Sequence, residues 1–302
     1  MPDPEEITVQ ASDLMFRPDL LKGHRILVTG GGTGLGREMA EALLILGARV
    51  YICGRRGTVL EETAKALMDA HGGTVVPATC DIRDADAIEA MVDTIWKDGG
   101  ALTGLLNNAA GNFISRTEDL SSRGFDAISS IVFRGSFLVT QACGKRWLAE
   151  GVSASVVSIL TTWVWNGSPF VVPSAMSKAG LHAMTQSLAV EWGNRGLRFN
   201  AIAPGLFPTE GMSKRLGPLG GMQVRGCPMG RPGRMPELAN LAAYLLAPGS
   251  EYVNGQTIAI DGGRYQADGG NFAELAAWGD EEWQQAREAI TRQNEKDKKQ
   301  RS

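Results

Sequence analysis

The stretch RILVTGGGTGLG, residues Arg25–Gly36, joins a short apolar run to a string of glycines. RILVTG predicts a buried strand, and the following REMAEALLILG (Arg37–Gly47) predicts a helix closed by its last glycine. Glycines at such a turn let the backbone approach a pyrophosphate, which the N–H groups of the helix N-terminus can bind. The strand–turn–helix context favours a dinucleotide site over a plain tight turn. We assign to cofactor binding Gly30, Gly32, Thr33, Gly34, Leu35 and Gly36.

The rest of the chain repeats this alternation of apolar strands and amphipathic helices. Further strands are predicted at 48–54, 73–81, 102–111, 154–160, 197–205 and 255–263, and helices at 58–72, 84–98, 125–151, 177–193 and 236–247. Fully apolar strands that alternate with helices imply a parallel sheet covered on both faces. We therefore predict an α/β, Rossmann-type doubly wound parallel sheet, a single domain with a C-terminal helical extension. The expected limits are 1–19 for an N-terminal arm, 20–263 for the dinucleotide-binding domain and 264–302 for the extension.

Composition excludes several classes of protein. The net charge of −3 over 302 residues provides no global field that would attract nucleic acid. The four cysteines form no CxxC pair and the three histidines are dispersed, so we expect neither a metal site nor a disulfide framework. No apolar run reaches the length of a membrane span, and neither terminus carries a secretory, transit or peroxisomal signal. These features predict a soluble cytoplasmic protein without nucleic-acid or membrane partners.

The residues after the second strand bear on cofactor choice. A carboxylate here would bind a ribose 2′-hydroxyl, but the sequence has Gly54 followed by Arg55 and Arg56. Their charge suits a 2′-phosphate and favours NADP(H) over NAD(H); the alternative is a solvated basic loop. Asp81, after the third strand, is placed to accept a hydrogen bond from the adenine amino group, with Arg83 adding charge nearby.

The motifs TGGGTGLG, CDIRD, LLNNAAG, SKAG and NAIAPG, in that order, resemble the short-chain dehydrogenase/reductase family. The match covers nearly the whole chain. NNAAGNFIS (Asn107–Ser115) and VVPSAMSKAG (Val171–Gly180) resemble, more specifically, the 2,4-dienoyl-CoA reductase branch. The resemblance implies fatty acid metabolism, a homotetramer assembled through two long helices, and further cofactor contacts at Ile82, Asn108, Lys178, Pro204, Gly205 and Phe207.

The wider family uses Asn, Ser, Tyr and Lys in catalysis, with the Tyr one helical turn before the Lys. Here the Lys is Lys178 and the Tyr position is Ser174, a much weaker acid; the resembling branch also has Ser there. The reaction of that branch requires hydrogen-bond donors to the thioester oxygen, on which negative enolate charge accumulates. Asn112 matches one donor. Trp163 stands where the branch has a second donor, Tyr, and its indole N–H donates but cannot deliver a proton.

Alternatives stay open for three of these positions. Trp163 is equally compatible with a wall of the acyl pocket, and Ser174 with a helix cap that has no chemical role. Arg134 replaces a structural Asn of the family; it either brings positive charge to the active site or points away, for instance into a salt bridge.

Between Met212 and Arg234 the chain has five basic residues and no acid, in a segment rich in Gly and Pro. This pattern predicts a loop whose charge suits the phosphates of coenzyme A; a solvated loop that contacts a neighbouring subunit is the alternative. By resemblance, Arg215, Phe113 and Ser121 are substrate residues.

Three functions follow. The first is NADPH-dependent reduction of a conjugated enoyl-CoA or 2,4-dienoyl-CoA, with an acyl-CoA thioester as substrate. The second is an oxidoreductase of the same fold with a cyclic or aromatic substrate, held in a flat pocket by Trp163, Trp165 and Phe170. The third is a catalytically silent NADP(H)-binding protein, consistent with the loss of both tyrosines.

Overall fold

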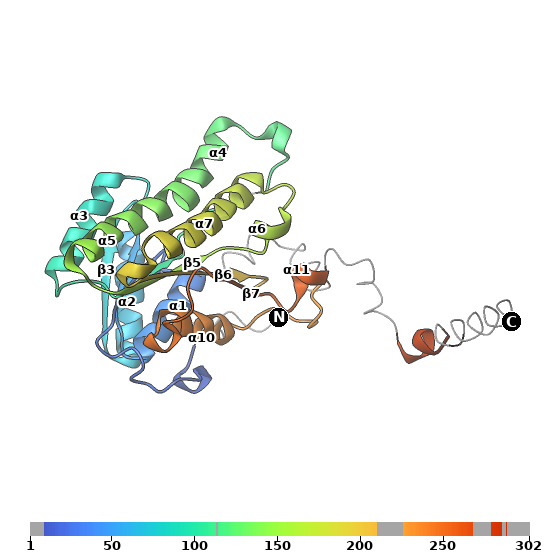
Figure 1. Cartoon of the computed structure of the whole chain (residues 1–302), viewed down its shortest axis with the longest axis horizontal. Coiled ribbons are helices and arrows are strands. Elements are labelled where there is room, and N and C mark those ends of the chain that lie inside the picture. The colour runs from blue at the N-terminus through green and yellow to red at the C-terminus, as the bar shows by residue number, and fades with distance from the viewer. Residues whose placement is uncertain (1–8, 113, 210–225, 268–278, 286–287, 289–302) are drawn as a thin grey trace.

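A seven-stranded parallel sheet organises the chain (Figure 1). This computed structural model describes residues 9–112, 114–209, 226–267, 279–285 and 288. The strand order is β3-β2-β1-β4-β5-β6-β7. The strands are β1 (Arg25–Thr29), β2 (Arg49–Gly54), β3 (Thr74–Thr79), β4 (Gly104–Asn107), β5 (Ala154–Ile159), β6 (Leu197–Pro204) and β7 (Thr257–Ile260). The predicted Rossmann-type doubly wound sheet is confirmed, with each predicted strand at its expected place in the chain.

Helices cover both faces of the sheet, as Figure 1 shows. One face has α1 (Gly34–Ile45), α2 (Gly57–His71) and α10 (Met235–Leu246), and the other has α3 (Ala85–Lys97), α4 (Ser122–Ser129), α5 (Ser136–Glu150) and α7 (Val172–Glu191). Two short helices, α6 (Trp163–Asn166) and α11 (Arg264–Ala267), lie beyond the sheet's carboxyl edge. A π-helical segment, Ser130–Gly135, joins α4 to α5.

The core divides between the two faces because successive strand residues point to opposite sides. In β1, Ile26 and Val28 pack with α1 and α10, whereas Leu27 packs with the α3 and α5 side. The N-terminal segment also contributes: Val9 and Leu14 are buried in the α1–α10 cluster, and the Asn240 side chain of α10 bonds the backbone of Asp13 and Met15.

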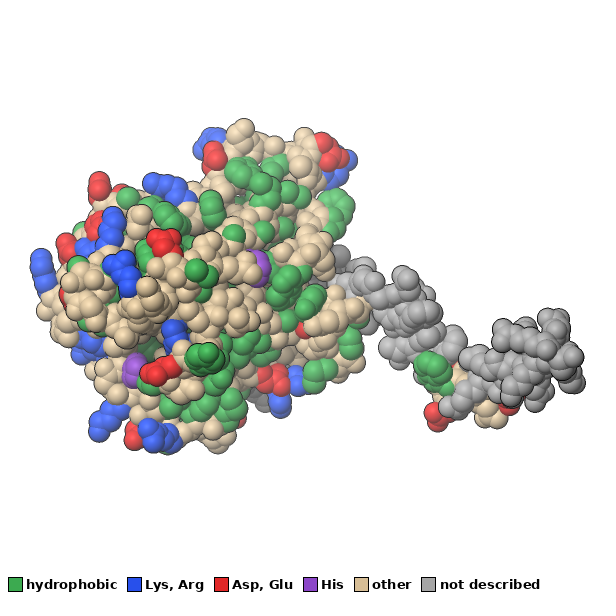
Figure 2. All heavy atoms as spheres, viewed as in Figure 1, with side chains coloured by type: hydrophobic (Ala, Val, Ile, Leu, Met, Phe, Trp, Pro, Cys, Tyr) green, Lys and Arg blue, Asp and Glu red, His purple; other side chains and the backbone are tan. Residues whose placement is uncertain are grey.

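The chain order of the strands reverses between β1 and β4. β2 and β3 extend the sheet from one side of β1, and β4 to β7 extend it from the other. The two connections leave in opposite directions, so a crevice opens outside the carboxyl ends of β1 and β4, where ligands of open α/β sheets bind. No helix among the described residues is long and apolar enough to cross a membrane. Basic and acidic side chains are interspersed on the face shown in Figure 2.

Candidate active site

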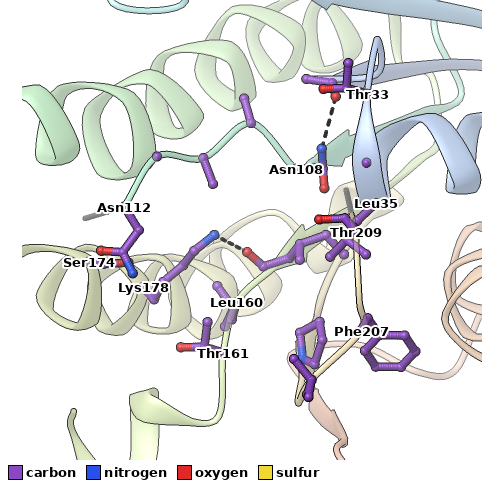
Figure 3. Close-up of a pocket in the computed structure, with 18 of the residues that line it drawn as sticks. Thr33, Leu35, Asn108, Asn112, Leu160, Thr161, Ser174, Lys178, Phe207 and Thr209 are labelled. Atoms are coloured by element: carbon purple, nitrogen blue, oxygen red, sulfur yellow. Dashed lines mark hydrogen bonds between the residues drawn. The ribbon is translucent and has the colours of Figure 1, made fainter. Parts of the chain in front are cut away.

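A cavity of about 1680 Å³ occupies this crevice. Figure 3 shows part of it, with Asn112, Ser174 and Lys178 grouped away from Thr33 and Leu35 of the glycine-rich turn. Its lining comes from the loops after β1 to β7, together with α6, α7 and α11. Residues far apart in sequence are thus brought together because every parallel strand ends at the same edge of the sheet.

The glycine-rich turn is shaped to admit a pyrophosphate. Gly30 and Gly34 have φ of +67° and +57°, a region that side chains rarely adopt. A Cβ on Gly36 would clash with the Gly30 carbonyl and with Asn108, so the helix approaches the turn only without a side chain there. The N-cap Thr33 makes no side-chain bond to the first turn of α1, which leaves its N–H groups for a ligand. These residues therefore fit the dinucleotide predicted from the sequence.

Thr29 ties this turn to the loop after β4. Its Oγ1 accepts hydrogen bonds of 3.0 Å from the backbone N–H groups of Asn108 and Ala109, and Asn108 Nδ2 donates to the Thr29 carbonyl. The loop that carries Asn112 is thus anchored at its start. It is held further along by Ser115, whose N–H donates to the Phe170 carbonyl at 2.9 Å. Phe170, at φ +64°, is the one described non-glycine residue with positive φ, a strained conformation often found at functional sites.

The far end of the cavity has the charges expected for an adenosine pocket. Arg55 and Arg56 are exposed and line it where β2 leads into the N-terminus of α2. Asp81 lines it as well, and its carboxylate accepts from Arg83 Nε at 2.9 Å. Hydrogen bonds from Arg83, with the charge of Arg55 adding, hold the pKa of Asp81 below its usual range. Asp81 therefore stays ionised as a hydrogen-bond acceptor.

Lys178 and Ser174 lie on the buried side of α7. They are 5% and 4% exposed, and the Lys178 ammonium donates to the Ile159 carbonyl at the end of β5. Burial lowers the pKa of Lys178 to about 8. Ser174 lies within the first turn of α7, whose N-cap is Val171, so it is not the cap of this helix. Both side chains line the cavity beside Asn112.

Trp163 also lines the cavity, from the first position of α6. No tyrosine lines it among the described residues. The structure answers the question about Arg134: its guanidinium donates to the Arg83 carbonyl, and it is not among the lining residues. Of the three aromatic residues expected to form a flat pocket, Trp163 alone lines the cavity; Trp165 and Phe170 are exposed.

The opposite wall is built from the ends of β6 and β7. Pro204, Gly205 and Phe207 line it, and a Cβ on Gly205 would lie 2.7 Å from Asp261 Cβ, so the two loops touch. In the predicted basic segment, Arg231 and Arg234 are not free cations. Both bond Glu237 on α10, Arg231 through two nitrogens at 2.7 and 2.9 Å. The bonds from Arg231 lower the pKa of Glu237 to about 2, so the acid stays charged and offsets them.

Comparisons with known proteins agree with this geometry. Residues 30–264 match a family model described as enoyl-(acyl carrier protein) reductase. The chain belongs to the short-chain dehydrogenase/reductase family. It is 41% identical to an uncharacterized oxidoreductase of Caenorhabditis elegans, over 98% of this chain and 97% of that protein. It is 40% identical, over 94% of both chains, to a probable 2,4-dienoyl-CoA reductase, (3E)-enoyl-CoA-producing, of the same organism.

A solved structure supports the same assignment. A putative 2-deoxy-D-gluconate 3-dehydrogenase of Agrobacterium tumefaciens, crystallised with bound NADP, superposes with a TM-score of 0.76 at 30% identity, over 83% of this chain and all of that one. The protein is thus an oxidoreductase of a family that uses NAD(P)H, and its resemblance to 2,4-dienoyl-CoA reductases is confirmed.

Most of the predicted site residues of this family member line one cavity. Among the described residues the exceptions are Gly36, which packs behind the turn, and Ser121, whose Oγ caps α4 by accepting from the Gly124 N–H. Phe113 and Arg215 lie outside the described residues. The cavity lining contains the predicted residues Gly30, Gly32, Thr33, Gly34, Leu35, Arg55, Arg56, Asp81, Ile82, Asn108, Asn112, Trp163, Ser174, Lys178, Pro204, Gly205 and Phe207.

Sequence reasoning missed several polar residues of the cavity, among them Thr161 and Arg264; Thr162, Thr209, Glu237 and Asp261 also line it. Thr161 follows β5, and its buried Oγ1 has no hydrogen-bond partner within the described part of the chain. Arg264 opens α11 and adds a cation to the C-terminal wall. Thr161 could have been found from its position in the sequence, because it lies directly after the predicted buried strand 154–160, whose carboxyl end faces the site. Arg264 has a weaker signal of the same kind: it directly follows the predicted strand 255–263, but β7 is the edge strand of the sheet, far from the crevice between β1 and β4.

Proposed function

We propose that the protein catalyses the NADPH-dependent reduction of a conjugated enoyl-CoA or 2,4-dienoyl-CoA thioester. One observation carries the proposal. The described cavity is lined by Asn112, Trp163 and Lys178, and no tyrosine among its described lining residues supplies the acidic phenol that ketone reduction needs. A conjugated thioester is the substrate for which such a site suffices, because its reduction first builds negative charge on the thioester oxygen.

The chemistry balances with one hydride and one proton. NADPH, when bound along the glycine-rich turn, would supply the hydride to the end of the conjugated system remote from the thioester. The Asn112 amide and the Trp163 indole N–H would donate to the enolate oxygen. Lys178, with its pKa of about 8, would place positive charge nearby. Neither donor can release a proton readily, so a proton from water would be added to carbon. The products would be NADP⁺ and a thioester with one carbon–carbon double bond fewer, which is an enoyl-CoA from a dienoyl-CoA or a saturated acyl-CoA from an enoyl-CoA.

Preference for NADPH over NADH is supported by Arg55 and Arg56. They stand at the N-terminus of α2, where the free N–H groups add to the attraction for a phosphate. Gly54 provides no carboxylate that would repel it. For the acyl-CoA, Arg231 and Arg234 contribute less charge than the sequence predicted because Glu237 pairs with both. Arg215 and Phe113 remain predicted substrate residues, as does Ser121.

The predicted homotetramer belongs to this proposal. Phe133 and Phe137 are 46% and 41% exposed around the start of α5, and Met176 on α7 is 57% exposed. These apolar side chains, on α5, on α7 and on the π-helical segment before α5, would be covered by a second copy. The cytoplasmic location and the place in fatty acid metabolism likewise remain predictions.

The test is turnover of a 2,4-dienoyl-CoA, followed by loss of NADPH absorbance. Asn112→Asp keeps the shape of the side chain but removes its donor, and we expect kcat to fall about 10²–10³-fold, as for loss of one oxyanion donor. Asn194→Asp, at an exposed position outside the cavity, should leave kcat unchanged. Tight NADPH binding without hydride transfer to any acceptor would refute the proposal and support the silent cofactor-binding protein.

A further inference from the structure

Trp163 is the first residue of α6, a helix whose position depends on packing against its neighbours. Helix α6 has four residues, too few to be stable alone, and it lies outside the sheet. Val164 is partly buried against a small cluster that includes Leu160 and Leu181. The orientation of α6 therefore depends on side-chain contacts made by its other residues.

Trp165 makes those contacts. Its ring stacks on Tyr265 of α11 with centroids 4.6 Å apart and planes at 22°, and it meets His182 of α7 edge-on at 6.3 Å. His182 Nδ1 lies 2.9 Å from the hydroxyl of Thr257 in β7. We call Trp165, Tyr265 and His182 the aromatic clip. It joins α6 to α7 and α11, and through Thr257 to the sheet.

Tyr265 is itself held in place by the loop after β7. One carboxylate oxygen of Asp261 accepts from the Tyr265 backbone N–H at 2.8 Å, and the other accepts from Gly263 at 2.9 Å. These bonds fix the start of α11. Its first residue, Arg264, lines the cavity. The clip thus links the Trp163 side of the cavity to the Arg264 side, although neither ring of the stacked pair lines the cavity.

We propose that Trp165 and Tyr265 are positioning residues that set the place of the Trp163 indole in the active site. The proposal rests on the function proposed above, in which Trp163 faces the thioester. Without the stacked Tyr265 ring, α6 can shift, and the indole N–H leaves the position where it meets the enolate oxygen. Because misplacement by about 1 Å can cost on the order of 100-fold in rate, we expect a kcat effect of roughly 10- to 100-fold.

A double-mutant cycle tests whether Tyr265 acts through Trp163. Tyr265→Ala should lower kcat for a 2,4-dienoyl-CoA in the natural background and have little further effect in a Trp163→Phe background. Tyr265→Phe keeps the ring and should restore kcat. Tyr252→Ala, a fully exposed tyrosine, is the matched control and should behave like the unsubstituted protein. The dissociation constant of NADPH should be the same in all of these variants. Equal losses of kcat from Tyr265→Ala in both backgrounds would overturn the proposal.

A second readout does not depend on turnover. Amide hydrogen exchange of the segment 161–167, measured without substrate, should be faster in Tyr265→Ala and unchanged in Tyr265→Phe and Tyr252→Ala. Unchanged exchange in Tyr265→Ala would overturn the aromatic clip. Faster exchange in a protein that reduces no conjugated thioester would leave the clip standing and refute the proposed function instead.

Discussion

Replacement of Glu38 by Gln should stabilise the protein at neutral and alkaline pH. Glu38 lies on the buried face of α1 and is 7% exposed. Burial, and then the negative charge of Glu41, raise the pKa of Glu38 from 4.5 to about 7, against smaller opposite effects of Arg37 and the Val9 backbone. Glu41 is itself buried, with one oxygen 2.8 Å from His71 Nε2. Within the described residues, Oε2 of each carboxylate has no hydrogen-bond partner.

The raised pKa of Glu38 determines how the stability of the protein changes with pH. The folded protein holds the proton of Glu38 more tightly than the unfolded chain does. Its contribution to stability is complete below pH 4.5 and is lost as the pH rises through about 7. At about 1.4 kcal/mol for each pKa unit, the loss amounts to about 3 kcal/mol above pH 8. Glutamine resembles the protonated acid at every pH, so Glu38→Gln should avoid this loss.

Denaturant unfolding monitored by circular dichroism, at one protein concentration and at several pH values between about 5 and 9, measures the effect. The free energy of unfolding of Glu38→Gln should exceed that of the natural protein by a margin that grows with pH to about 3 kcal/mol. Glu62→Gln, at an exposed position of α2, is the control and should show no such growth. A constant difference between Glu38→Gln and the natural protein across the range would refute the reasoning.

Three further predictions concern the cavity and its cofactor turn. Because the pKa of Lys178 is about 8, kcat/KM should decline above that pH as the ammonium loses its proton. An active Lys178→Arg variant should lack this decline, since arginine stays charged. A flat kcat/KM profile of the natural protein up to about pH 9.5 would contradict this prediction. Arg56→Ala should weaken NADPH binding about tenfold or more and leave NADH binding unchanged in fluorescence titrations; equal losses for both would exclude a 2′-phosphate contact. Gly31→Ala would place a Cβ 2.6 Å from Ile52 Cγ2, so thermal or denaturant unfolding should show a loss of about 1–3 kcal/mol, and a smaller loss when it is introduced into Ile52→Ala, which lacks that methyl group. An equal loss in both backgrounds would mean that the clash lies elsewhere.

The sheet was predictable because its strands are short apolar runs between clear helices, and Arg25–Gly36 carries its own turn chemistry. Helix starts were less predictable. Helix α7 begins at Val172, five residues before the predicted Ser177, because Pro173 is tolerated in the first turn of a helix. The earlier start places Ser174 inside the helix, on the same face as Lys178. Helix α6 was missed because four residues are too few to show a period.

Charge was the least predictable part of the site. Five basic residues between Met212 and Arg234 indicated a cationic loop, but the fold brings Glu237 of the next helix against two of them. Arg264 supplies charge to the same wall from the far end of the sheet. The two Glu237 pairs are local, three and six residues apart, and lay just beyond the basic segment that ended at Arg234. The place of Arg264, by contrast, depends on which loops meet at the carboxyl edge, and the local pattern of a sequence does not contain that information.

We propose above all that the enzyme transfers hydride from NADPH to a conjugated thioester and stabilises the resulting enolate without a tyrosine. The most direct measurement uses NADPH deuterated at the transferable position, with a 2,4-dienoyl-CoA and a simple ketone offered in parallel and the products analysed by mass spectrometry. We expect deuterium on an acyl carbon remote from the thioester, a second hydrogen taken from solvent, and an unlabelled ketone. Label transferred to the ketone while every unsaturated CoA thioester is recovered unchanged would contradict the claim.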